Sequence, residues 1–163
     1  MNVYVFARVH NAGRSQMARA FFNQFADPKL ASALSAGTAP VAHVHPEVVR
    51  VMREEGIDLG KVQPQKLTHE IVNGANALIT IGCGEEWPPV PGLKRIDWPI
   101  VDPRAKDIPT VRAIRNEIKH RVLELIHAEG VARKYGVDSP ANYDRAGDET
   151  SFLRYPTVRR PGS

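Results

Sequence analysis

Apolar residues along this chain alternate between short runs and longer stretches in which they recur at helical spacing. The first run is Val3 to Phe6, and Met17 and Phe21 follow it on one helical face. Short runs of β-branched or aromatic residues that end at turn residues are typical of strands. The pattern predicts strands near residues 3–6, 33–36, 77–81 and 94–97, and helices that begin near Ser15, His45, Thr68 and Ile108.

The last of these helices has the clearest signal. Behind Ile108, apolar residues recur at intervals of three and four, at Val111, Ile114, Ile118, Val122 and Leu125. Strands that alternate with helices favour right-handed crossovers and a parallel sheet that is covered on both faces. Ligands bind such sheets at the carboxyl ends of the strands. The loop after the first strand is therefore the first candidate for a functional site.

Length and composition indicate one domain with a polar tail. A chain of 163 residues is within the range of one compact domain. Residues 1–129 carry the apolar pattern, whereas residues 130–163 form a predicted C-terminal extension that is partly disordered or draped on the surface. No secretory signal and no run of roughly 18 apolar residues is present, so we expect a cytoplasmic protein without membrane association.

Charge and cysteine content narrow the possible ligands. Basic residues exceed acidic ones by 22 − 18 = 4, which favours small anions, and their scatter along the chain argues against nucleic acid. The single cysteine, Cys83, excludes an internal disulfide and any reaction cycle that closes one within the chain. His43 and His45 have no third ligand near them in the sequence, so we expect no metal and no cofactor.

The loop between the first strand and the first helix has the composition of an anion cradle. A short loop that opens a helix turns backbone N–H groups toward one point, where the helix dipole adds positive potential. Gly13 permits close approach, Asn11 tolerates a left-handed backbone, and the fork of Arg14 can grip two oxygens. Ser15 is a suitable cap for the helix that follows. A plain structural turn is the alternative interpretation.

The residues of this loop also resemble a known active site. The segment from Val9 to Ala18 is similar to the active-site loop of thiol-dependent arsenate reductases with the low-molecular-weight tyrosine phosphatase fold. Further matches follow in the family's order at residues 35–38, 56–59, 80–84, 97–98, 102–103 and 111–118. The resemblance implies a single three-layer α/β domain, in which helices flank a four-stranded parallel sheet with the first strand in its interior.

The family's loop begins with a nucleophile that this chain does not have. In the family a cysteine is followed by five residues and an arginine; its thiolate attacks phosphate or arsenate while the arginine holds the oxyanion. Counting back from Arg14 places Arg8 at the cysteine position. Arginine, with a pKa above about 12, cannot act as a nucleophile. Its side chain either lies on the surface or points inward, where an anion or a carboxylate such as Asp102 must compensate its charge.

Two further residues match catalytic positions of the family. Asp102, before Pro103, matches the general acid, although an aspartate before proline is also common in turns. Cys83 matches the cysteine that attacks the thiol–arsenic adduct in reductases with an internal relay, and Trp87 stands where the last cysteine of that relay is expected. A lone cysteine at a strand end also fits a buried, unreactive position.

Three functions are compatible with these residues. The first is a protein that resembles arsenate reductase and binds arsenate or phosphate without cysteine-based catalysis. The second is an active arsenate reductase or phosphatase that uses Cys83 or an external thiol, with a low-molecular-weight thiol or a thioredoxin-type reductant as partner. The third is a non-catalytic protein-interaction module. The candidate catalytic residues are Asp102 and Cys83, and the candidate oxyanion-binding residues are Arg8, Val9, His10, Asn11, Ala12, Gly13, Arg14 and Ser15.

Overall fold

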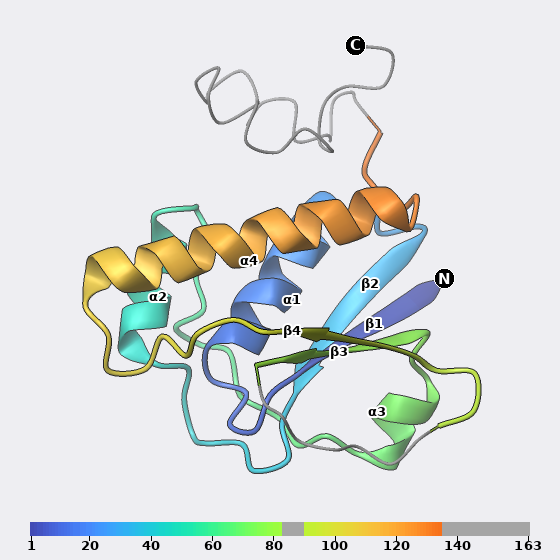
Figure 1. The fold of residues 1–163 in the computed structure, drawn as a ribbon, viewed down its shortest axis with the longest axis horizontal. Coiled ribbons are helices and arrows are strands. Elements are labelled where there is room, and N and C mark those ends of the chain that lie inside the picture. The colour runs from blue at the N-terminus through green and yellow to red at the C-terminus, as the bar shows by residue number, and fades with distance from the viewer. Residues whose placement is uncertain (83–89, 135–163) are drawn as a thin grey trace.

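The computed structural model describes residues 1–82 and 90–134 and has the predicted alternation of strands and helices (Figure 1). The strands are β1 (Asn2–Ala7), β2 (Ala31–Ala36), β3 (Ala77–Ile81) and β4 (Lys94–Trp98). The helices are α1 (Arg14–Phe25), α2 (Pro46–Arg53), α3 (His69–Asn73) and α4 (Ile108–Ala128). All eight predicted elements are confirmed, with strand ends that differ from the prediction by at most two residues.

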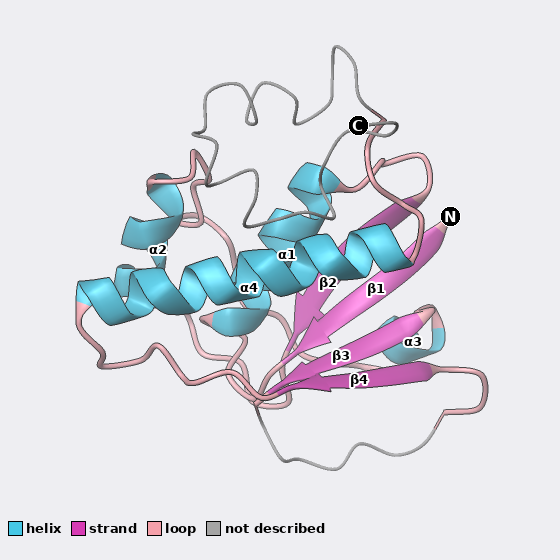
Figure 2. Ribbon diagram, turned by 45° about the horizontal axis from the view of Figure 1, so that its top comes forward, coloured by secondary structure: helices cyan, strands magenta, loops and turns pink. Residues whose placement is uncertain are grey.

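The four strands form one parallel sheet in the order β2-β1-β3-β4, so β1 lies in the interior as expected. Val5 of β1 is in register with Leu34 of β2 on one side and Leu78 of β3 on the other. Because neighbouring strands run in the same direction, their carboxyl ends meet at one edge of the sheet (Figure 2). The loops that follow β1, β2, β3 and β4 therefore start close together.

Helices cover the two faces of the sheet unequally, and Figures 1 and 2 show α1 and α4 on one face and α3 on the other. The α1 and α4 side holds the main core, in which the rings of Tyr4 and Phe22 lie 4.8 Å apart and those of Phe6 and Trp98 lie 5.6 Å apart. Each large side chain buried there contributes about 1.5–3 kcal/mol to stability. The side under α3 has a smaller cluster around Val5 and Leu78.

Local signals in the sequence determine where several helices begin. Asp107 caps α4 by accepting a hydrogen bond from the Thr110 N–H at 2.9 Å, and Thr68 caps α3 by accepting one from the Ile71 N–H at 3.2 Å. Pro46 occupies the first turn of α2, directly after His45, as the sequence predicts. None of the described helices has the length and apolar content that crossing a membrane requires.

Candidate oxyanion site

Residues 8–13 connect β1 to α1, and the carbonyl groups of this loop face the segment that follows β2. The oxygens of Val9, His10 and Ala12 accept hydrogen bonds from the N–H groups of residues 39, 41 and 45, at 2.9, 3.2 and 2.9 Å. In a trans peptide, the next N–H points opposite to the carbonyl. The N–H groups of His10, Asn11 and Gly13 therefore point away from that segment.

These N–H groups have no acceptor among the residues that the structure describes. Within residues 1–82 and 90–134, the backbone N–H groups of residues 9–13 donate no hydrogen bond. They lie at the N-terminal end of α1, where the helix dipole adds positive potential. A row of unused donors at a helix N-terminus is the arrangement that binds oxyanions.

Asn11 fixes the shape of the loop. Its φ of 53° lies in the left-handed region, as expected from its residue type. The side chain is fully buried; its Oδ1 accepts hydrogen bonds from Gln16 Nε2 and the Gln65 N–H, both at 3.0 Å. Its Nδ2 donates to Ser15 Oγ at 2.9 Å. Sequence reasoning missed Gln16 and Gln65, since nothing in their spacing links them to Asn11.

The predicted capping role of Ser15 is wrong. Helix α1 begins at Arg14, one residue before Ser15 and within the expected range, and its N-cap is Gly13, which has no side chain to accept a hydrogen bond. Ser15 lies inside the first turn and accepts the hydrogen bond from Asn11 instead. The physical reason is that the capping position falls on the residue with the most permissive backbone.

Two glycines let the surrounding chain pack closely on the loop. A Cβ on Gly37 would lie 2.4 Å from the carbonyl oxygens of both Arg8 and Val9. A Cβ on Gly13 would lie 3.3 Å from Pro103 Cγ and 3.6 Å from His45 Cδ2. Side chains thus pack on Gly13, whereas backbone atoms pack on Gly37. Sequence reasoning included Gly37 only as part of the matched segment 35–38 and assigned it no role.

Arg14 and Asp102, which are far apart in the sequence, meet at the end of the loop. Arg14 is 3% exposed; its Nη1 donates to the carbonyl oxygen of Ile100, and its Nη2 lies 3.6 Å from Asp102 Oδ2. Asp102 Oδ1 accepts a hydrogen bond from the Arg104 N–H at 2.9 Å. The structure therefore brings together two of the predicted site residues beside the N-terminus of α1.

The electrostatic surroundings keep Asp102 ionised. Burial raises the pKa of Asp102, but the hydrogen bond from the Arg104 N–H and the charges of Arg14, Arg8 and Arg104 outweigh it, so the pKa lies below its ordinary value. Arg8 is half-buried and its charge reaches this carboxylate.

The remaining predictions concern Cys83, Trp87 and metal binding. Cys83 and Trp87 lie outside the described residues. Gly82, directly before Cys83, packs against Arg14, since a Cβ on Gly82 would lie 2.6 Å from Arg14 Nη1. The described residues contain no group of three side chains suited to a metal ion.

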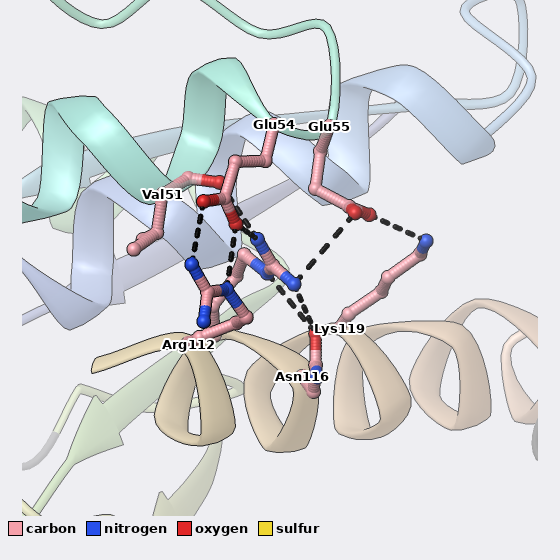
Figure 3. Close-up of polar contacts among 7 residues, drawn as sticks. Val51, Glu54, Glu55, Arg112, Asn116 and Lys119 are labelled. Carbon is pink, nitrogen blue, oxygen red and sulfur yellow. Dashed lines mark hydrogen bonds and ion pairs between the residues drawn. The ribbon is translucent and has the colours of Figure 1, made fainter. Parts of the chain in front are cut away.

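A second polar cluster joins α2 to α4 (Figure 3). Glu54 accepts hydrogen bonds from Arg112 and from Arg115, whose Nη1 also donates to the Val51 carbonyl at 2.8 Å. The bonds from Arg112 and Arg115 lower the pKa of Glu54 to about 2. Lys119 pairs with Glu55 at 2.7 Å. These contacts give the matched segment 111–118 a structural role in holding α2 against α4.

Comparisons with known proteins agree with this fold. Residues 4–137 match the family model for low molecular weight phosphotyrosine protein phosphatase. A putative arsenate reductase of Halobacterium salinarum is 36% identical over 124 residues, which cover 74% of this chain and 87% of that protein.

Solved structures show the same relationship. A thioredoxin-dependent arsenate reductase of Corynebacterium glutamicum is 33% identical, with a TM-score of 0.66, over 77% of this chain and 60% of that one. A solved arsenate reductase in the phosphate binding state is 27% identical, with a TM-score of 0.65, over 77% of this chain and 97% of that one. The chain therefore belongs to the family of low molecular weight phosphatases and of the arsenate reductases that share their fold.

Proposed function

We propose that this protein binds arsenate or phosphate in the loop of residues 8–15 and does not perform the cysteine-based catalysis of its family. The observation that carries the proposal is a loop in which the backbone N–H groups of residues 9–13 have no acceptor among the described residues, combined with Arg8 at its first position. The unused N–H groups, the α1 N-terminus and the guanidinium of Arg14 are retained at this loop.

Binding is supported by the charges around the loop. The charges of Arg8, Arg14 and Arg104 all act on one carboxylate, Asp102, so positive charges outnumber negative ones in this set. An oxyanion of charge −2 would compensate that excess, and the arginine fork suits its tetrahedral oxygens. The relative solved in a phosphate binding state supports the same choice of ligand.

The absence of a thiolate in the loop supports the loss of catalysis. Covalent transfer to the loop requires a nucleophile at the base of the cradle, where the family has cysteine and this chain has Arg8. Without that nucleophile, Asp102 has no leaving group to protonate. We therefore infer that the protein acts as a sensor, a scavenger or a partner subunit and does not turn over a substrate.

The experiment is calorimetric titration of the full chain with arsenate and with phosphate. It is paired with assays of p-nitrophenyl phosphate hydrolysis and of arsenate reduction with glutathione or thioredoxin. We expect binding without turnover. The Arg14→Lys variant, which loses the planar fork, should bind at least about tenfold more weakly, and Arg53→Lys on the exposed end of α2 is the matched control. If the chain binds neither arsenate nor phosphate, the proposal is refuted and an interaction module is favoured.

One observation favours a second candidate, an arsenate reductase that has moved its nucleophile to Cys83. Gly82, one residue earlier, packs against Arg14 at the carboxyl end of β3. Such an enzyme would take electrons from a low-molecular-weight thiol or a thioredoxin-type reductant in the cytoplasm. If the unmodified chain reduces arsenate and Cys83→Ser does not, this candidate is established and the first is overturned.

A further inference from the structure

We propose that Asp102 makes the site selective for tetrahedral dianions that still carry an acidic proton. Hydrogen phosphate and hydrogen arsenate would bind, whereas sulfate and selenate, of matching size and charge, would be rejected. This inference rests on the proposed function, because it concerns the anion held by the same loop. It assigns Asp102 a role in recognition that requires no chemical turnover.

The position of Asp102 brings one of its oxygens to the loop. Oδ2 lies 3.6 Å from Arg14 Nη2, whereas Oδ1 accepts the hydrogen bond from the Arg104 N–H at 2.9 Å. The next residue, Pro103, packs on Gly13, since its Cγ would be 3.3 Å from a Cβ there. The side chain of Asp102 is 41% exposed, so a small ion from solvent can reach the carboxylate.

The neighbours of Asp102 also determine what it can do there. Three arginines and one backbone N–H stabilise the carboxylate and outweigh the effect of burial, so Asp102 is ionised at neutral pH. An ionised carboxylate accepts hydrogen bonds and donates none. The loop N–H groups and the guanidinium groups, by contrast, only donate.

A ligand in this site therefore meets donors on the loop side and an acceptor at Asp102. Hydrogen phosphate can satisfy both, because three of its oxygens accept while its O–H donates to Asp102 Oδ2. Sulfate has no proton, so one of its oxygens would face the carboxylate. These two negatively charged groups would repel each other, and no hydrogen bond would join them. The donors alone cannot distinguish these two dianions, and the discrimination falls to Asp102.

The first test is a ligand series on the unmodified full chain at about pH 8 and constant ionic strength. Calorimetry should show phosphate and arsenate binding at least about tenfold more tightly than sulfate and selenate, the size of effect expected for a hydrogen bond to a charged group. Fluorophosphate, a phosphorus dianion without an acidic proton, should behave like sulfate. Equal binding of all five anions would overturn the selectivity and leave the proposed oxyanion binding intact.

The second test is the Asp102→Asn variant, whose amide can donate as well as accept. We expect sulfate and phosphate to bind it within about threefold of each other, because the unfavourable contact with sulfate is removed. Asp58→Asn is a closely matched control: Asp58 also accepts from the N–H two residues on, at 2.8 Å, and also lies near an arginine, at 3.5 Å. It should keep the preference for phosphate.

The outcomes separate this inference from the function on which it rests. If Asp102→Asn keeps the preference for phosphate, another group discriminates and the inference is wrong. If the unmodified chain binds none of the anions, the proposed function fails as well. Should Asp102→Asn not fold, as judged by circular dichroism, the ligand series on the unmodified chain decides the question alone.

Discussion

Arg8 and Asn11 illustrate how single residues define this site. Asn11 is buried within the loop, and its side chain ties the loop to Gln16 and Gln65. The residue type alone predicted its left-handed backbone, because asparagine enters that region more readily than most residues. Arg8 has no such local signature. Arg8 matters because it stands at the family's cysteine position, counted back from Arg14, and because its charge acts on Asp102.

At this scale we predict that Arg8→Cys hydrolyses p-nitrophenyl phosphate and that the unmodified chain does not. A thiol placed among unused N–H groups at a helix N-terminus has a lowered pKa and is present as the thiolate nucleophile. Removing Arg8 also removes one of the charges that lower the pKa of Asp102, which favours its use as an acid.

The matching control for that variant is Arg8→Ser, which removes the same charge without adding a thiol. Steady-state phosphatase rates should rise above background in Arg8→Cys alone. For arsenate, product formation should depend on added thiol, because Trp87 leaves the internal relay incomplete. Equal rates in the two variants would show that the cradle cannot support the family's first covalent step.

Elements of this fold meet where the chain after β2 passes the loop. Gly37 donates from its N–H to the Gln65 carbonyl at 2.9 Å and packs on the carbonyl oxygens of Arg8 and Val9. Residues 39, 41 and 45 then bond to the loop along its length. The loop of residues 8–13 is thus held from one side by the β2–α2 connection, and the backbone N–H groups of residues 9–13 donate no hydrogen bond to the other described residues.

We predict that Gly37→Ala destabilises the fold by about 1–3 kcal/mol and weakens phosphate binding, because the new methyl group would overlap two backbone oxygens that cannot move independently. Urea unfolding and calorimetry measure the two effects. Gly74→Ala is the control, since the nearest atom to its added Cβ is 3.4 Å away and its φ is negative. The prediction fails if both alanines change stability equally.

At the scale of the whole molecule, the ionic cluster in Figure 3 connects α4 to the C-terminal end of α2. Arg115, which is buried on α4, bonds to Glu54 and to the last turn of α2. At the other end, α2 begins directly after His45, whose N–H donates a hydrogen bond to the Ala12 carbonyl oxygen in the loop. The position of α2, and with it that of Val48 beside Gly13, therefore depends on contacts made away from the loop.

This cluster contributes to the pH dependence of stability. Hydrogen bonds from Arg112 and Arg115 lower the pKa of Glu54 to about 2, below the ordinary value of 4.5 that applies in the unfolded chain. Between these values the unfolded state binds more protons, so the contribution of Glu54 is fully present above about pH 5 and is lost as the pH falls toward 2.

Urea unfolding at several pH values in this range should show a smaller acid-induced loss in Glu54→Gln than in the unmodified protein. Glu117→Gln, on the exposed face of α4 where Glu117 pairs with Arg121 of the same helix, is the comparison. It should follow the unmodified profile. A Glu54→Gln profile that is identical to that of the unmodified protein would place the acid sensitivity elsewhere.

Periodicity and local chemistry in the sequence determined the elements of this protein. Runs such as Val3 to Phe6 and the three- and four-residue spacing after Ile108 predicted the strands and helices, because each signal arises between residues close in sequence. The parallel sheet followed from their alternation, and the interior position of β1 from the family resemblance. The sequence also placed Arg8 at the first position of the loop, which defines the functional question.

Only the tertiary structure decided which residues meet around that loop. Asp102 beside Arg14, Gly37 against the Arg8 carbonyl, and Gln65 on Asn11 each join segments that are far apart in sequence. Such contacts depend on how the crossovers place the strand ends, and no local pattern records that arrangement. The same reason explains Ser15: a residue suited to capping was displaced into the helix because the path of the loop put Gly13 at the N-cap.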